Sequence, residues 1–397
     1  MSPVGDPADE MRGRRPPRYW DVASLFLKLG VISFGGPAAH IALMREEVVR
    51  RRKWVSDEQF LDLLGASHLI PGPTATELAI YLGYVRSGWR GLVLGGSLFV
   101  LPATLMTLGL AWAYVRYGSL PEALWILGGI KPVMIAIIVM ALWGLFKSAV
   151  KDVLLGAIGL AALALYLFGF SPILVLFGGG VIALLARRAP RWRRTAGKAL
   201  LLAGLGAPAL AAQAAGAPAQ YGLWILFLNF LKIGSVVYGS GYVLLSFLRT
   251  DFVDRLHWLT DQQLIDAVAV GQFTPGPVFT TATFIGYLVG GTHGAVAATV
   301  AIFLPSFVFV AVAYPALGWL RRSAAAGALL DGVNVAALGL MAAVGWELGR
   351  TAIIDWFSAG LAIAALAVLL RFRTNSAWLI AGGALAGVAR HLLIGLS

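Results

Sequence analysis

Two lysines, Lys28 and Lys232, lie inside apolar stretches of the sequence, where a charged side chain is energetically expensive. Each sits in a nearly identical motif, Phe26–Gly30 (FLKLG) and Phe230–Gly234 (FLKIG). A lysine at the centre of a membrane helix costs about 2.5–3.5 kcal/mol and is usually functional where it is retained. The alternative is that the long side chain reaches the membrane interface. We favour a role in binding an anion.

A Pro-Gly-Pro motif also occurs twice, at 71–73 and 275–277. The apolar segments that follow, Thr74–Val85 and Val278–Val289, are too short to span a bilayer. Helices broken in this way leave free backbone N–H groups and positive dipole ends, which suit a dianion with four oxygens. The prolines and glycine could instead make only a tight turn. Repetition at the same place favours a binding role.

Glu77 follows the first Pro-Gly-Pro motif in an otherwise apolar stretch, and the second copy has Thr281 instead. A carboxylate inside a membrane protein is a candidate carrier of a coupled proton. It could equally be an acid at a helix N-terminus, stabilised by the helix dipole. Arg45 and Arg249 could supply further charge to the anion, or could fix the orientation of nearby loops.

The composition indicates a membrane protein. Of 397 residues, 59% are hydrophobic and 13% charged, with a mean hydropathy of +0.81, whereas soluble domains have about 25% charged residues. Long apolar runs recur, and several can cross a hydrocarbon core of about 30 Å. Backbone groups in lipid must be hydrogen-bonded within the protein, so these runs must be helices. They are Gly91–Tyr114, Leu124–Phe146, Val153–Phe170, Ile173–Ala186, Ala295–Ala313 and Leu361–Leu370.

Several function classes are disfavoured. The net charge of +12 could suggest nucleic acid binding, but the basic residues lie mainly in short loops between apolar segments, where topology places them. There is no cysteine and no histidine pair with metal-binding spacing, so we expect no metal. A cluster of the kind that an intramembrane enzyme needs is missing from the sequence. We expect no enzyme activity and no cofactor.

The chain contains an internal duplication. A displacement of 204 positions matches Arg51 with Arg255 and Trp54 with Trp258, and one residue is lost after the Pro-Gly-Pro motifs. The first 19 residues and Val22–Phe34 resemble a signal peptide, but the second stretch has an internal counterpart, which argues against cleavage. We expect a cytoplasmic tail (1–19), a first repeat (20–190), a linker (191–220) and a second repeat (221–397).

Loop charges predict that the two repeats are inverted. Arg45–Lys53 carries +3 and Arg86–Arg90 carries +2, whereas the equivalent loops of the second repeat are neutral. Basic loops face the cytoplasm. An extra crossing at Ala199–Ala217 would invert the second repeat and place the N-terminus inside and the C-terminus outside. We therefore predict an all-α polytopic membrane protein of two inverted-topology repeats.

Broken helices and re-entrant hairpins are expected in both repeats. Ser56 with Gln59, and Thr260 with Gln263, have the spacing of a helix capping box. The helix that starts there ends at Pro-Gly-Pro, so each motif should join two short arms that enter the membrane partway. The glycine runs Gly178–Gly180 and Gly382-Gly383 predict close helix packing.

The sequence resembles the chromate ion transporter family in its two-domain form, over nearly the whole chain. The resemblance rests on Ser33–Pro37 (SFGGP), the Arg45 to Trp54 spacing, the paired Pro-Gly-Pro motifs, and the prolines Pro102 and Pro305. It implies a multi-pass protein of the bacterial or archaeal inner membrane that exports chromate and gives chromate resistance. It also implies importance for the turn at 35–37. His68 departs from the glutamine seen at Gln272.

The expected partners are a small inorganic oxyanion, chromate or sulfate, and the lipid bilayer, and a homodimer stays open. The absence of a nucleotide-binding P-loop favours coupling to the proton gradient or membrane potential, with the halves rocking about a midplane site. An anion channel is the alternative. Glu77 is the coupling candidate. The candidate substrate-binding residues are Lys28, Lys232, Gly35, Gly36, Pro37, Gly239, Ser240, Pro71, Gly72, Pro73, Pro275, Gly276, Pro277, Arg45 and Arg249.

Overall fold

The computed structural model describes residues 19–34, 36–118, 120–188, 222–238, 243–314, 324–372 and 374–394. These residues form helices and no strands. Five of the helices are long and apolar enough to cross a membrane. The predicted all-α polytopic class is therefore confirmed.

The described part of the chain begins at Tyr19. The elements of the first repeat, in order, are α2 (Tyr19–Ile32), α3 (Pro37–Arg45), the π-helix η1 (Glu46–Arg51), α4 (Asp57–Ser67), α5 (Thr74–Tyr117), α6 (Pro121–Ala149), α7 (Val153–Leu167) and α8 (Pro172–Arg188).

Within the described residues, the second repeat has the same succession of elements except for one additional 3₁₀ helix, η4. They are α10 (Leu223–Val236), α11 (Leu244–Leu248), the π-helix η3 (Arg249–Arg255), α12 (Asp261–Phe273), the short 3₁₀ helix η4 (Val278–Thr280), α13 (Thr281–Ala313), α15 (Ala324–Ala352), α16 (Trp356–Phe372) and α17 (Ser376–Ile394).

The predicted helix starts at α4 and α12 are confirmed. The Ser56 hydroxyl accepts the N–H of Gln59 at 3.1 Å, and the Thr260 hydroxyl accepts that of Gln263 at 3.1 Å. At Thr260 the box is complete, because its own N–H donates to Oε1 of Gln263 at 2.9 Å. Each cap satisfies backbone donors that the first helical turn leaves free.

Helices α5 and α13 each contain a sharp turn that divides them into two arms. The turns lie at Ser87-Gly88 and Gly290-Gly291. The second residue of each pair is a glycine with positive φ, 60° at Gly88 and 59° at Gly291. Glycine adopts this left-handed conformation readily because it has no Cβ. Within α5, Gly83 and Gly91 lie in backbone contact across the turn. The first arms are the short segments that the sequence predicts after Pro-Gly-Pro, and they pack on α4 and α12.

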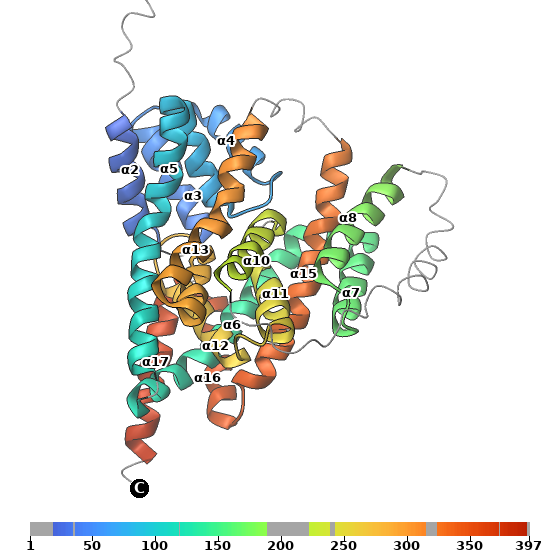
Figure 1. Ribbon diagram of the computed structural model, residues 1–397. Coiled ribbons are helices and arrows are strands. Elements are labelled where there is room, and N and C mark those ends of the chain that lie inside the picture. Colours follow the sequence, from blue (N-terminus) through green and yellow to red (C-terminus); the bar gives the residue numbers. More distant parts are fainter. Residues whose placement is uncertain are drawn as a thin grey trace, which may run out of the picture.

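The two repeats are inverted, as the loop charges predict. Tyr114, near the end of α5, contacts Phe284, near the start of α13, with ring centroids 5.2 Å apart. Tyr314, directly after α13, contacts Tyr84 in the first arm of α5, with centroids 4.6 Å apart. The equivalent second arms therefore pass each other in opposite directions. Figure 1 shows α2 and α17 at opposite ends of the molecule.

The repeats are interlocked by an exchange of helices. Helix α6 packs on α16 and α17 of the second repeat, and α15 packs on α7 and α8 of the first. Glycines make these contacts close: Gly129 meets Gly383, and Gly332 meets Gly179. Close packing was predicted for both glycine runs, and Gly179, Gly180 and Gly383 confirm it, while Gly178 and Gly382 face open space.

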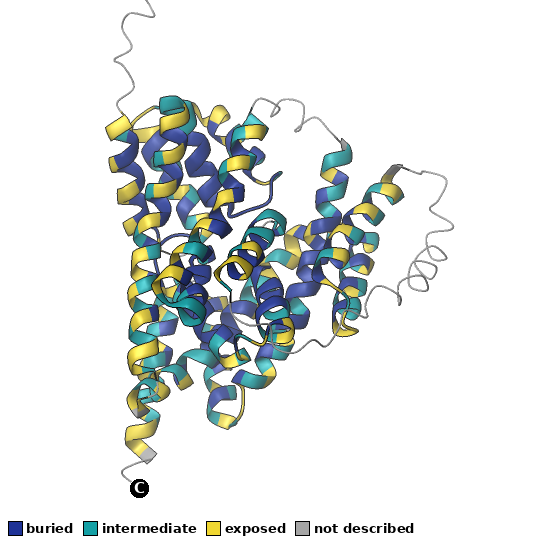
Figure 2. Cartoon of the chain, viewed as in Figure 1, coloured by how far each residue is buried: buried dark blue, intermediate teal, exposed yellow. Residues whose placement is uncertain are grey.

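The outer surface is apolar where lipid would cover it. Helix α5 exposes large hydrophobic side chains along its second arm, among them Val93, Leu105 and Trp112. Figure 2 shows exposed positions along the outer faces of α2, α5 and α17, and buried ones towards the interior. The predicted crossing at Ala199–Ala217 lies outside the described residues. The orientation of the termini stays a prediction.

We predict that substituting Gly332→Leu lowers the stability of the protein. A side chain there would strike the Gly179 carbonyl and Ala183, and overpacking of this kind costs about 1–3 kcal/mol or more. The measurement is the melting temperature of the purified protein in detergent. Gly327→Leu is the matched control, because Gly327 on the same helix has nothing within 4 Å of its Cβ position. Equal melting temperatures for the two variants would contradict the interlocked packing.

Candidate functional site

Two backbone hydrogen bonds join the repeats where their helices are broken. The Gly72 N–H donates to the Val237 carbonyl at 2.8 Å, and the Gly276 N–H donates to the Ser33 carbonyl at 2.8 Å. Both donors and acceptors are related by the displacement of 204 positions (72 and 276; 33 and 237). We call these four residues the central crossing. Each Pro-Gly-Pro turn thus lies against the end of the first helix of the other repeat.

The glycines of the central crossing are required by conformation and by space. Gly72 has a φ of +134° and Gly276 has a φ of +94°, backbone angles that residues with a Cβ rarely adopt. A Cβ at Gly72 would meet the Glu77 carboxyl and the Ser306 hydroxyl, and one at Gly276 would lie 2.9 Å from the Cβ of Ala103. The flanking prolines prevent either helix from continuing through the turn.

The sequence suggested that these turns present free N–H groups to an anion. The N–H groups of Gly72 and Gly276 were expected to face an anion, but in this conformation they donate hydrogen bonds to carbonyl oxygens. Both N–H groups are therefore occupied in this conformation. Each turn nevertheless contacts the other repeat, so both lie at the interface between the repeats.

Glu77 lies directly beside the central crossing and is completely buried. The Ser306 hydroxyl is adjacent to its carboxyl group, and the phenols of Tyr81 and Tyr238 are within electrostatic range. Among the described residues, neither carboxyl oxygen makes a well-formed hydrogen bond. Buried carboxyl groups are normally paired. An unpaired one at the interface between two repeats is suited to hold a proton or to change partners.

His40 is a residue of this region that sequence reasoning missed. Its Nε2 lies 3.0 Å from the Ser33 carbonyl, and its ring packs edge-on against Phe99 with centroids 5.8 Å apart. Burial lowers the pKa of His40 to about 4, so the ring is neutral and its Nε2–H donates to Ser33. The second repeat has Leu244 at this position, so no repeated motif drew attention to His40.

Both candidate lysines are paired with buried acids at equivalent positions. Lys28 Nζ lies 2.7 Å from Glu47 Oε1, and Lys232 Nζ lies 2.6 Å from Asp251 Oδ2. The two acids are displaced by the same 204 positions (47 and 251). Their repetition in the sequence is the signal that could have identified them. The lysine side chains are 48% and 31% exposed.

Each of these acids is shared by more than one cation. Arg51 and Arg52 also lie 3.4 and 3.3 Å from Glu47, and Arg255 lies 3.1 Å from Asp251. The hydrogen bond from Lys28 lowers the pKa of Glu47, which therefore stays ionised. We name the two groups, Lys28–Glu47–Arg51–Arg52 and Lys232–Asp251–Arg255, the cationic clusters. Their surplus positive charge attracts anions.

Arg45 and Arg249 are held in ion pairs at the starts of helices. Arg45 pairs with Asp57 at 2.8 Å and Arg249 with Asp261 at 2.9 Å, so both acids pair locally. Arg249 also contacts Asp254 and Glu347. Because carboxylates already surround Arg249, this geometry supports the structural alternative over direct binding of the substrate.

Two of the remaining candidates, Gly36 and Pro37, lie at the start of α3. Gly36, with a φ of +85°, is the N-cap of α3, and Pro37 is its first residue, a position that proline favours. Gly35, Gly239 and Ser240 lie outside the described residues.

Two inverted helical repeats, interlocked and broken at a shared centre beneath an apolar surface, define a multi-pass membrane protein with the construction of a transporter. A family model described as "Chromate transporter" matches residues 20–184 and again residues 224–388. The chain therefore belongs to the chromate transporter family, and the resemblance noted in the sequence is confirmed.

Named relatives cover most of the chain. It is 38% identical to a chromate transport protein of Cupriavidus metallidurans, over 93% of this chain and 92% of that protein. It is 35% identical to a probable chromate transport protein of Synechococcus elongatus, over 83% and 84% of the two chains. It is 34% identical to a chromate transport protein of Pseudomonas aeruginosa, over 84% and 82%. No solved structure matches the chain significantly.

We predict that Gly72→Ala destabilises the protein more than Gly169→Ala does. Both glycines have positive φ, +134° at Gly72 and +85° at Gly169, but of the two only Gly72 has neighbours at its Cβ position, so the difference combines packing at the central crossing with the greater backbone strain there. We expect a difference of about 1–3 kcal/mol, the usual cost of overpacking. Thermal unfolding of the purified variants measures it. Equal losses in the two variants would show that the crossing tolerates an added methyl group.

Proposed function

We propose that the protein is a secondary active transporter that exports chromate across the plasma membrane of a bacterium or archaeon and so confers chromate resistance. The observation that carries this proposal is the central crossing, where two inverted repeats exchange backbone hydrogen bonds beside the buried Glu77. Membership of the family, and the fact that two relatives are named chromate transport proteins, support chromate as the substrate.

The cationic clusters would concentrate the dianion near the site. In each, an acid holds the lysine in place while the surplus positive charge remains available. A tetrahedral dianion would then reach the central crossing, where opening of the repeats frees the N–H groups of Gly72 and Gly276. Backbone donors at broken helices are the usual means by which transporters hold anionic groups.

Alternating access follows from the inversion. Each hydrogen bond of the central crossing closes one repeat against the other, and the two bonds are related by the inverted symmetry. Breaking one bond would open the site towards one side of the membrane, and breaking the other would open it towards the opposite side. Glu77 lies in only one repeat, so it would couple a proton to one of these steps.

Uptake of radioactive chromate into everted membrane vesicles tests the substrate and the energy coupling. We expect uptake that depends on this protein and falls when an ionophore collapses the gradients. Uptake that is unaffected by the ionophore would indicate a channel. Uptake of sulfate in place of chromate would move the proposal to a different tetrahedral oxyanion.

We predict that Lys28→Met abolishes chromate uptake, and that Lys28→Met combined with Glu47→Gln does not restore it. The double variant removes both charges of the ion pair, so the acid is no longer left without its lysine. If Lys28 binds the anion, both variants fail; if it only neutralises Glu47, the double variant works. Lys147→Met is the matched control, because Lys147 lies over Trp143 outside the cationic clusters. Recovery of uptake in the double variant would contradict the binding role.

We predict that Glu77→Gln separates transport from its driving force. Gln is close to Glu in size but cannot carry a proton between two charge states. We expect exchange of chromate across proteoliposomes to persist, while gradient-driven uptake falls to the level of ionophore-treated vesicles. Thr76→Ser, at the adjacent buried position, is the control. Gradient-driven uptake at the normal rate in Glu77→Gln would exclude this residue as the coupling group.

A further inference from the structure

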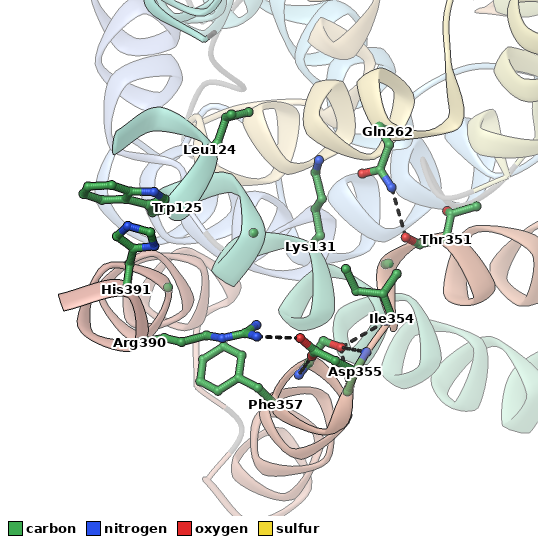
Figure 3. Close-up of a pocket in the computed structure, with 14 residues that line it drawn as sticks. Leu124, Trp125, Lys131, Gln262, Thr351, Ile354, Asp355, Phe357, Arg390 and His391 are labelled. Atoms are coloured by element: carbon green, nitrogen blue, oxygen red, sulfur yellow. Dashed lines mark hydrogen bonds and ion pairs between the residues drawn. The ribbon is translucent and has the colours of Figure 1, made fainter. Parts of the chain in front are cut away.

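A cavity of about 340 Å³ lies away from the central crossing, among α6, α12, α15, α16 and α17. Figure 1 places α12, α16 and α17 together towards the end of the molecule opposite α2. Its polar lining includes Lys131, Gln262, Thr351, Asp355, Arg390 and His391. Figure 3 shows these side chains converging on the cavity from several helices.

Lys131 is the notable cation of this cavity. Its ammonium lies 3.6 Å from Oδ1 of Asp266, which is farther than a hydrogen bond. Asp266 is 1% exposed, its Oδ2 accepts the hydroxyl of Tyr114 at 2.9 Å, and its Oδ1 makes no hydrogen bond among the described residues. Lys131 therefore lies between the cavity that it lines and a buried carboxylate with which it forms an ion pair, and its side chain is 17% exposed. A ligand in the cavity would compete with Asp266 for the ammonium group.

The rest of the lining favours negative charge. Lys131 and Arg390 carry positive charges, and Asp355 is the one acid among the residues that line the cavity. Asp355 is already satisfied, since it pairs with Arg390 at 2.7 Å and accepts the Ser358 N–H at 2.8 Å. His391 stacks on Trp125 with ring centroids 3.8 Å apart, which fixes another polar group at the wall.

The location that the repeat relates to this cavity has different residues. Ser148 and Asp152 match Thr351 and Asp355 with a displacement of 203 positions. By the same displacement, Asn334 replaces Lys131, and Asp331 replaces Gly128, which lines the cavity.

Ion pairs occupy that equivalent place. Asp331 is held by Lys151 at 2.7 Å and by Arg187 at 2.9 Å. At the equivalent place the cations Lys151 and Arg187 are thus held by Asp331, whereas Lys131 lines a cavity.

We propose that this cavity is a vestibule that binds a tetrahedral oxyanion, with Lys131 as its anchoring cation; the choice of oxyanion rests on the proposed function. The anion would draw the ammonium of Lys131 away from Asp266, while Tyr114 keeps its hydrogen bond to the carboxylate. The cavity is larger than a bare oxyanion and leaves room for part of its hydration shell. Binding here would precede or follow passage through the central crossing.

The test uses the absence of cysteine from the natural chain. A single cysteine replaces Thr351, which lines the cavity, and its reaction with a maleimide is timed in the purified full-length protein. The probe is sodium sulfate, a tetrahedral dianion that does not oxidise thiols, compared with sodium chloride at equal ionic strength. We expect sulfate to slow labelling severalfold. The matched control is Ser148→Cys, at the equivalent exposed position, where we expect no protection.

Protection must also depend on Lys131. We expect Lys131→Met to abolish it, and Lys131→Met with Asp266→Asn to abolish it too, since the double variant folds without an unpaired buried acid. Lys131→Arg should retain part of it, and Lys151→Met, which removes a lysine from the other location, should retain all of it. Absence of protection, or full protection in both Lys131→Met variants, would overturn the proposal.

Failure of the proposed function gives a different result. If vesicles with the unaltered protein show no chromate uptake while sulfate protection depends on Lys131, the vestibule stands and the transport proposal fails. If chromate uptake is normal and protection is absent, the vestibule fails and the transport proposal stands.

Discussion

The structure depends on one exchange, in which each repeat satisfies the backbone that the other leaves broken. A helix interrupted inside a membrane protein exposes N–H and C=O groups, and each one left unsatisfied in a dry environment costs several kcal/mol. Here the N–H of one Pro-Gly-Pro turn meets the carbonyl at the end of the opposite first helix, twice, at 2.8 Å. Neither repeat can complete its own backbone at this point without the other.

The inverted arrangement and the helix exchange accompany this pair of bonds. The second arms of α5 and α13 pass in opposite directions, as the aromatic contacts at their ends show. Helices α6 and α15 then cross to the opposite repeat, where facing glycines permit backbone contact. The duplication supplies the symmetry, while Glu77, His40 and Lys131 each occur in one repeat only.

Local signals in the sequence predicted much of this. The apolar runs, the capping residues at Ser56 and Thr260, and the repeated motifs each reflect a short-range rule, and the structure follows them. The partners were harder to predict, because hydrogen bonds such as Gly276 to Ser33 join residues far apart in sequence. Glu47 and Asp251 could have been found from the repeat itself. Lys131 could not, since its importance arises from a cavity and from a buried acid on another helix.

The most direct test of the account is a structure of the purified protein with chromate, in which the chromium atom is located by its anomalous scattering. The account predicts chromium between the two Pro-Gly-Pro turns, with at least one hydrogen bond of the central crossing broken and the freed Gly72 or Gly276 N–H directed at the oxyanion. Chromium bound elsewhere, with both hydrogen bonds of the crossing intact, would contradict the claim that the repeats share one site there.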